Sequence, residues 1–129
     1  FSIDHSGILQ PLQPESYIAI NPLPKSMTIN PAGTIAYVLN ENNEILTYTI
    51  NSSGVLQLLP NTSIQTGEGT FGFTIDPKGE YGYVTGFGDI NMTIYSIANN
   101  GTLTQSSTES AGYFNDATPI SLTFYTNGN

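Results

Sequence analysis

The chain has 129 residues and no cysteine, and its ten acidic residues against two lysines give a formal net charge of −8. A surface this acidic repels phosphate backbones and anionic membranes, so we expect no nucleic-acid partner. The chain holds no apolar run long enough to cross a bilayer, so we expect no membrane insertion. The lack of cysteine also excludes disulfides and thiolate metal sites.

The first ten residues, FSIDHSGILQ, form a glycine-containing turn that returns twice along the chain. Gly7, Gly54 and Gly101 are 47 residues apart in both steps (54 − 7 and 101 − 54). The isoleucine four residues before each glycine and the leucine two residues after it keep the same spacing. A period in the forties with several short strands is typical of a β-propeller. His5, the only histidine, lies in the first of these turns, and we expect it to be an exposed turn residue.

A second kind of turn also occurs twice. Residues 30–33, NPAG, and 76–79, DPKG, have the preferences of a type I β-turn and lie 46 residues apart (76 − 30). Each is followed by a run of β-branched and aromatic residues that predicts a strand. Both runs contain a very small residue, Ala36 or Gly82, which suggests that a neighbouring layer approaches closely there.

Four strands, a to d from the propeller axis outwards, are predicted in each repeat. They lie near residues 26–29, 35–39, 45–50 and 55–65, and again near 72–75, 81–85, 93–97 and 102–110. Strand c of the first repeat is apolar on both faces, so its sheet must be covered on both faces, as a blade between two blades is. We therefore interpret the periodic tyrosines as packing between blades. They are Tyr37, Tyr48, Tyr83 and Tyr95.

The predicted fold class is all-β, with β-propeller blades of four antiparallel strands that form a partial propeller; an antiparallel β-sandwich is the alternative. The chain is expected to be a single propeller segment, residues 1–129. Its units are strand d of a preceding blade at 1–25, complete blades at 26–66 and 67–111, and the start of a third at 112–129. An open stack exposes apolar faces and strand edges. We therefore expect an oligomer or a part of a longer chain, with a protein partner or self-association through the open blade edges.

The motifs YVLN at 37–40 and YVTG at 83–86, each preceded by Pro-x-Gly, resemble the Tyr-Val-Thr-Asn repeats of lactonase-type seven-bladed propellers. This group includes 6-phosphogluconolactonase-like proteins and surface-layer repeat proteins. The resemblance covers nearly the whole chain and implies the fold, because its motifs specify blades. It also implies a lactone hydrolase as one activity, but none of that activity's catalytic residues can be placed on a position of this chain.

Loops at the d-to-a and b-to-c connections are where propellers usually bind ligands, and they supply the candidate contacts for a ligand or partner. These are Glu41, Asn42, Glu44, Glu68, Phe87, Asp89, Asn115 and Asp116. Glu41 with Glu44, or Asp89 with Asp116, could offer oxygens to calcium. Solvated loop carboxylates are the preferred interpretation, because no D-x-D-x-D-G spacing is present, so we expect no metal and no cofactor.

Two functions remain open from the sequence. The first is a non-catalytic scaffold or interaction module, extracellular, on the cell surface or periplasmic. This hypothesis rests on the blade repeats, the 9% charged content and the scarcity of cationic side chains. The alternative is a segment of a 6-phosphogluconolactonase-type hydrolase whose catalytic residues lie outside this chain.

Overall fold

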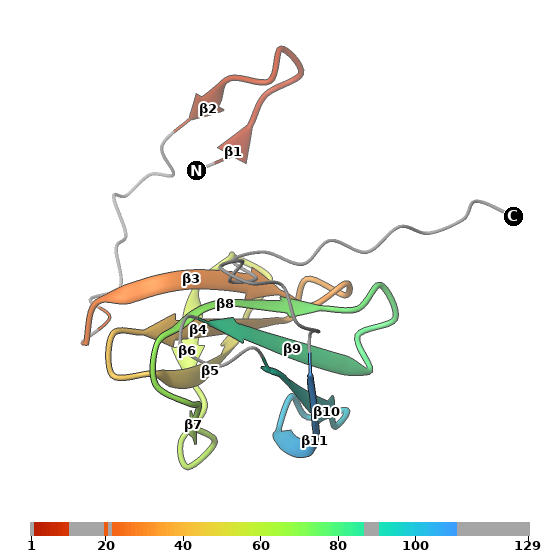
Figure 1. Cartoon of the computed structure of the whole chain (residues 1–129). Helices are drawn as coiled ribbons and strands as arrows, with labels where there is room; N and C mark the ends of the chain where they lie inside the picture. The colour runs from red at the N-terminus through yellow and green to blue at the C-terminus, as the bar shows by residue number, and fades with distance from the viewer. Residues whose placement is uncertain (1, 11–19, 21, 87–90, 111–129) are drawn as a thin grey trace, which may run out of the picture.

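The computed structural model describes residues 2–10, 20, 22–86 and 91–110, which form strands and turns (Figure 1). These residues include no helix that is long and apolar enough to cross a membrane. The N-terminal strands β1 (Ser2–Ile3) and β2 (Leu9–Gln10) pair as a small antiparallel hairpin. His5 is exposed in its turn, as expected.

Two antiparallel sheets follow in chain order. The first contains β3 (Pro24–Ile29), β4 (Ile35–Asn40), β5 (Glu44–Ile50) and β6 (Leu56–Leu58), with β7 (Ile64–Gln65) also paired to β5. The second contains β8 (Thr70–Ile75), β9 (Tyr81–Gly86), β10 (Asn91–Ile97) and β11 (Leu103–Ser110). In both sheets each strand pairs with the next one along the chain, except that β7 pairs with β5 and not with β6. This arrangement confirms the all-β class and the antiparallel blade of four strands.

The two sheets repeat one another in detail. The pairing of β3 with β4 shifts between Pro24 and Ser26, and the pairing of β8 with β9 shifts between Thr70 and Gly72. These irregularities are 46 residues apart (70 − 24), the spacing of the sequence repeat. The division into units at 1–25, 26–66, 67–111 and 112–129 stays a prediction, and residues 112–129 lie outside the described residues.

The predicted turns are present and explain the repeated glycines. In the NPAG and DPKG turns, the amide groups of Gly33 and Gly79 donate to the carbonyl oxygens of Asn30 and Asp76, each at 2.9 Å. Both glycines have positive φ angles, 71° and 76°, which side chains rarely tolerate. The side chains of Asn30 and Asp76 also accept hydrogen bonds from backbone amides across their turns.

Strand d of the first repeat differs from the prediction. The sequence predicts one strand over 55–65, but the structure has two short strands, β6 and β7. Between them Pro60 lacks an amide donor and Asn61 adopts a φ of 60°, so the chain leaves the sheet. The second repeat has only a bulge at the equivalent place, where the register shifts between Ile94 and Tyr95.

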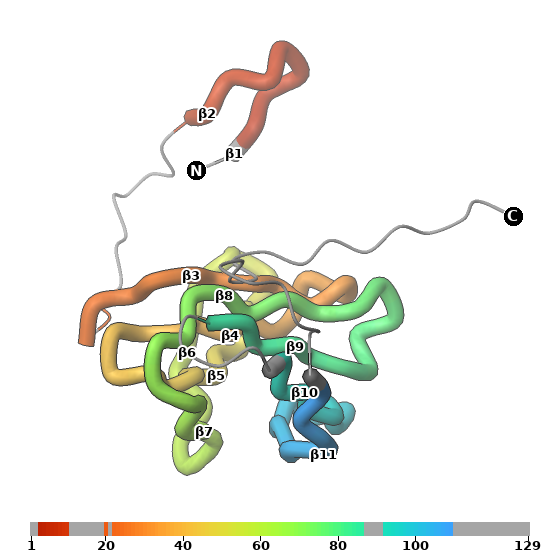
Figure 2. Tube along the Cα trace, in the orientation of Figure 1, coloured from red at the N-terminus to blue at the C-terminus, as the bar shows by residue number. Residues whose placement is uncertain are grey.

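The main core lies between the two sheets. Ile35, Tyr37 and Leu39 of β4 and Ile45 of β5 pack against apolar residues of the second sheet. Those residues are Phe73, Ile75, Val84, Tyr95 and Leu103. Strands β3 and β8 lie side by side (Figure 2), and the Thr28 hydroxyl of β3 donates to the Phe73 carbonyl of β8. The rings of Tyr37 and Phe73 meet with centroids 5.4 Å apart.

A second cluster occupies the other face of the first sheet. Ala36, Val38 and Tyr48 are buried there, and Ile20 packs against them. All six residues of β4 are buried, so this strand is covered on both faces. The prediction that the periodic tyrosines pack between blades is confirmed for Tyr37 and Tyr95, which lie in the core between the two sheets. Tyr48 is buried on the outer face and Tyr83 is half-buried, and the packing of these two against a further blade stays a prediction.

The predicted close approach at Gly82 is present, but the neighbour belongs to the same sheet and not to another layer. The ring of Phe73, from the neighbouring strand of the same sheet, lies 2.4 Å from where a Cβ of Gly82 would be. The small residue therefore makes room for an aromatic ring that fills the space between the sheets.

Candidate functional site

The β4–β5 turn and the β7–β8 connection meet at one end of the two sheets. Asn40, the last residue of β4, is fully buried and organises the turn. Its side-chain oxygen accepts from the amides of Asn42 and Glu44 at 3.0 and 3.1 Å. Its side-chain nitrogen donates to the Glu44 carboxylate at 3.2 Å. Glu44 is therefore held by the fold, while Glu41 and Asn42 point to solvent as exposed residues.

Asn43 connects this turn to the second sheet. Its φ of 57° is one that asparagine tolerates better than most residues. Its side-chain oxygen accepts from the Lys25 ammonium at 3.0 Å and from the Thr70 hydroxyl at 3.1 Å. Its backbone carbonyl accepts from the Thr66 amide and hydroxyl. Lys25 also donates to the Thr70 carbonyl at 3.2 Å, so one lysine joins both sheets.

Replacement of Asn43 by alanine should lower the free energy of unfolding by about 2 kcal/mol, because it adds backbone strain and removes an acceptor of two hydrogen bonds. Asn43→Gly is the matched control. It keeps the positive φ available and should cost only about 1 kcal/mol. Urea denaturation followed by circular dichroism measures both, and equal losses for the two variants would contradict this account of Asn43.

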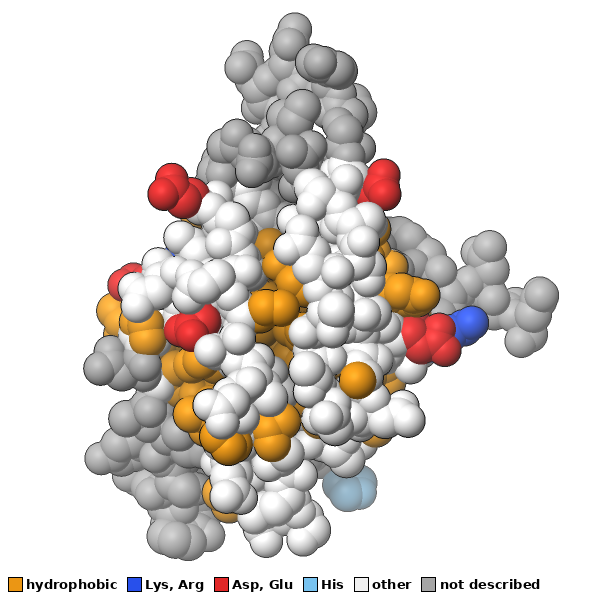
Figure 3. Space-filling view, turned by 90° about the horizontal axis from the view of Figure 1, so that it is seen from below, with side chains coloured by type: hydrophobic (Ala, Val, Ile, Leu, Met, Phe, Trp, Pro, Cys, Tyr) orange, Lys and Arg blue, Asp and Glu red, His pale blue; other side chains and the backbone are white. Residues whose placement is uncertain are grey.

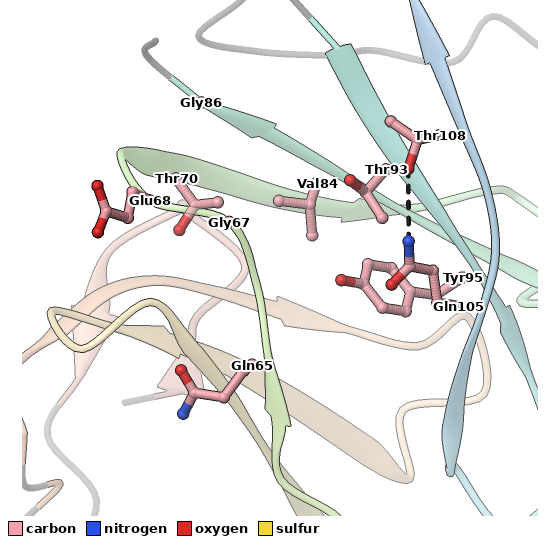
Figure 4. Close-up of a pocket in the computed structure, with 10 residues that line it drawn as sticks. All are labelled: Gln65, Gly67, Glu68, Thr70, Val84, Gly86, Thr93, Tyr95, Gln105 and Thr108. Carbon is pink, nitrogen blue, oxygen red and sulfur yellow. Dashed lines mark hydrogen bonds between the residues drawn. The ribbon is translucent and has the colours of Figure 1, made fainter. Parts of the chain in front are cut away.

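A pocket of about 210 Å³ lies beside this network, between the two sheets (Figure 4). Its lining is mostly polar and comes from the end of β7, the β7–β8 connection and one face of the second sheet. The lining residues are Gln65, Gly67, Glu68, Thr70, Val84, Gly86, Thr93, Tyr95, Gln105 and Thr108. The Tyr95 hydroxyl is protonated at neutral pH and can donate a hydrogen bond, and burial raises its pKa further above the ordinary value.

The structure brings together only part of the predicted site. Glu41, Asn42 and Glu44 share one turn, and Glu68 is exposed at the rim of the pocket. Phe87, Asp89, Asn115 and Asp116 lie outside the described residues. Among the residues that the structure does describe, no group of three or more His, Asp or Glu side chains lies close enough to hold a metal ion.

Sequence reasoning missed the Lys25–Asn43–Thr70 network and most of the pocket lining. Asn43 could have been found, because an asparagine following Asn-Glu-Asn at the end of a strand favours a turn with a positive φ. The pocket residues Thr93 and Gln105 carried a second signal. They are polar where the preceding repeat has Leu46 and Leu58, each 47 residues earlier (93 − 46 and 105 − 58).

Comparison with known proteins supports the fold and leaves the activity open. No family model and no curated protein matches the chain. A functionally unknown protein from Desulfotomaculum acetoxidans matches 93% of it with 22% identity and a TM-score of 0.70. A candidate 6-phosphogluconolactonase from Bacteroides fragilis matches 81% with 21% identity and a TM-score of 0.65. A protein from Lactobacillus plantarum matches 67% with 18% identity and a TM-score of 0.59.

These neighbours support a lactonase-like β-propeller fold. At identities of 18% to 22% the likeness concerns the fold alone. The matched region covers 28% to 37% of the neighbouring chains, so the chain spans about a third of their length. That it is a segment of a longer propeller stays a prediction.

Proposed function

We propose that this chain is a non-catalytic β-propeller scaffold or interaction module, exported or surface-associated, which pairs with a further blade through the outer face of its first sheet. The proposal rests on the apolar side chains that remain exposed on that face. Met27, Ile29 and Leu58 lie on it with 54%, 47% and 51% of their surfaces exposed. They flank the buried cluster of Ala36, Val38 and Tyr48.

The favoured occupant of this face is another blade of the same type. The opposite face of the first sheet already packs against a blade, the second sheet, through a continuous apolar core. Apolar groups that remain half-exposed on a sheet face favour burial by about 25 cal/mol per Å². For the isolated chain in solution, the expected occupant is a second copy of the same chain.

The polar groups of the described loops support a structural role. Lys25 donates to Asn43 and Thr70, so it serves the junction between the sheets. The Glu44 carboxylate accepts from Asn40 within its own turn. No lysine or arginine is among the residues that line the pocket. A lactonase acting on an anionic sugar would be expected to need such a cationic side chain to hold its substrate. The low charged content, 9%, is typical of exported β-proteins.

The test is the mass of the purified chain in solution. Light scattering at micromolar concentration should give a multiple of 13.8 kDa. The double variant Met27→Glu with Leu58→Glu should shift the mass towards one chain, since it places charges on the proposed contact face. Val55→Glu is the matched control, because Val55 is 47% exposed but lies in the β5–β6 turn. A wild-type mass of one chain would overturn the proposal.

The alternative, a segment of a lactonase-like hydrolase, is favoured by one observation, the candidate 6-phosphogluconolactonase among the structural neighbours. A pH-stat assay with glucono-δ-lactone and with 6-phosphogluconolactone separates the two. The scaffold proposal expects the rate of buffer alone for both substrates. Hydrolysis that rises in proportion to protein concentration would instead support the hydrolase.

A further inference from the structure

The pocket between the sheets contains a buried tyrosine whose hydroxyl has no hydrogen-bond partner among the described residues. Tyr95 of β10 is only 1% exposed, yet its hydroxyl makes no hydrogen bond with any described residue. In Figure 4 the ring lies across the pocket floor and its hydroxyl points into the space between the second sheet and Gln65. Buried hydroxyl groups are nearly always hydrogen-bonded. A water molecule or a ligand group inside the pocket can supply this partner.

The same position in the preceding repeat shows that the polar lining is a departure from the repeat. Tyr48 of β5 is equivalent to Tyr95 (95 − 48 = 47) and pairs across the sheet with Leu58. Tyr95 pairs with Gln105 instead. Likewise Val38 pairs with Leu46, whereas Val84 pairs with Thr93. Two leucines of the first repeat are thus replaced by an amide and a hydroxyl, both facing the pocket.

The hydrogen-bonding groups that line the pocket indicate which kind of ligand it can bind. Gln65 and Gln105 offer amide donors and acceptors, Thr93 and Thr108 offer hydroxyls, and Glu68 offers an acceptor at the rim. Gln105 donates to the Thr108 hydroxyl at 3.4 Å, a long and exposed hydrogen bond on that side of the pocket. The lining includes no lysine or arginine, and the nearby Lys25 ammonium is engaged with Asn43 and the Thr70 carbonyl, so an uncharged ligand is favoured over an anion. A volume of about 210 Å³ is below the ~300–1,000 Å³ of pockets for drug-sized molecules.

We infer that the pocket between the two sheets binds an uncharged polyhydroxylated molecule of the size of one sugar ring, with the Tyr95 hydroxyl as donor and Thr93 and Gln105 as further contacts. The amide and hydroxyl groups of the lining both donate and accept hydrogen bonds, as the hydroxyl groups of a polyol do. This binding site is independent of the proposed blade pairing, which uses the opposite face of the first sheet.

The experiment is an amide-resolved NMR titration of the whole chain with methyl β-D-glucopyranoside, myo-inositol and, as an anionic comparator, D-gluconate. At least one neutral probe should shift the amide signals of Thr93, Tyr95, Gln105 and Thr108. D-gluconate should shift them less at equal concentration. Tyr95→Phe should weaken the binding by about fivefold, the effect of one neutral hydrogen bond.

The repeat itself provides two controls. Tyr48→Phe makes the same change at the equivalent position outside the pocket and should leave the titration unchanged. The double variant Thr93→Leu with Gln105→Leu restores the residues of the preceding repeat, so it should stay folded and abolish the shifts. Absence of shifts with both neutral probes, stronger binding of D-gluconate, or unchanged binding in Tyr95→Phe would each overturn the inference.

Discussion

Truncation of Tyr37 to alanine is expected to lower the free energy of unfolding by about 4 kcal/mol, the size seen when a large buried side chain is removed. Tyr37 is 0% exposed and lies between the two sheets. Its ring contacts Phe73, and its hydroxyl donates to the Gly101 carbonyl at 2.9 Å. The variant therefore loses apolar contact and a hydrogen bond across the interface together. Urea denaturation followed by circular dichroism gives the value.

Tyr37→Phe separates the two contributions. It keeps the ring and leaves the Gly101 carbonyl without its donor, so it should cost about 1–2 kcal/mol. Burial raises the pKa of Tyr37 to about 12, which agrees with a hydroxyl that is shielded from water. If Tyr37→Ala cost no more than Tyr37→Phe, the ring would not be part of a packed interface, and the arrangement of the sheets would be wrong.

Replacement of Gly82 by valine is the second change with a large expected effect, a loss of about 3 kcal/mol. A Cβ at this position would lie 2.4 Å from the Phe73 ring, well inside van der Waals contact. The ring cannot move away easily, because it is 5% exposed and packed against Tyr37. Thermal unfolding by calorimetry measures the change in stability.

A double-mutant cycle provides the control for Gly82. Phe73→Leu alone should destabilise the chain, because it removes part of the core. Combined with Gly82→Val, it should cost clearly less than the sum of the two single changes, since the smaller side chain leaves room for the added methyl groups. Strict additivity would show that the two residues do not compete for the same space.

The repeat made most of the fold predictable. Strands c and b were placed correctly because both repeats carry the same β-branched and aromatic pattern after a Pro-x-Gly turn. The turn glycines were predictable because Gly33 and Gly79 need a positive φ. The break in strand d was not predicted, since Leu59 and Ile64 continue an apolar pattern on either side of Pro60 and Asn61. Local turn chemistry there outweighs the strand pattern.

The candidate site was less predictable for a physical reason. Glu41, Asn42, Glu44 and Glu68 were chosen because carboxylates and amides in loops are common contacts. The partners that decide their roles come from distant parts of the chain, as when Lys25 reaches Thr70. The hydroxyl of Tyr95 becomes part of a pocket only because Gln65 of β7, in the other sheet, lines its opposite side. Such contacts depend on how the two sheets pack, which no local pattern encodes.

The central claim is that consecutive repeats form two equivalent sheets packed face to face, and nuclear Overhauser contacts test it most directly. We expect cross-peaks between the Tyr37 and Phe73 rings, between Thr28 and Phe73, and between a methyl group of Ile35 and Gly101. The first two contacts link strands of different sheets, and the third links β4 of the first sheet to the β10–β11 turn of the second. A spectrum with the strand pairings within each sheet but without these three contacts would contradict the account.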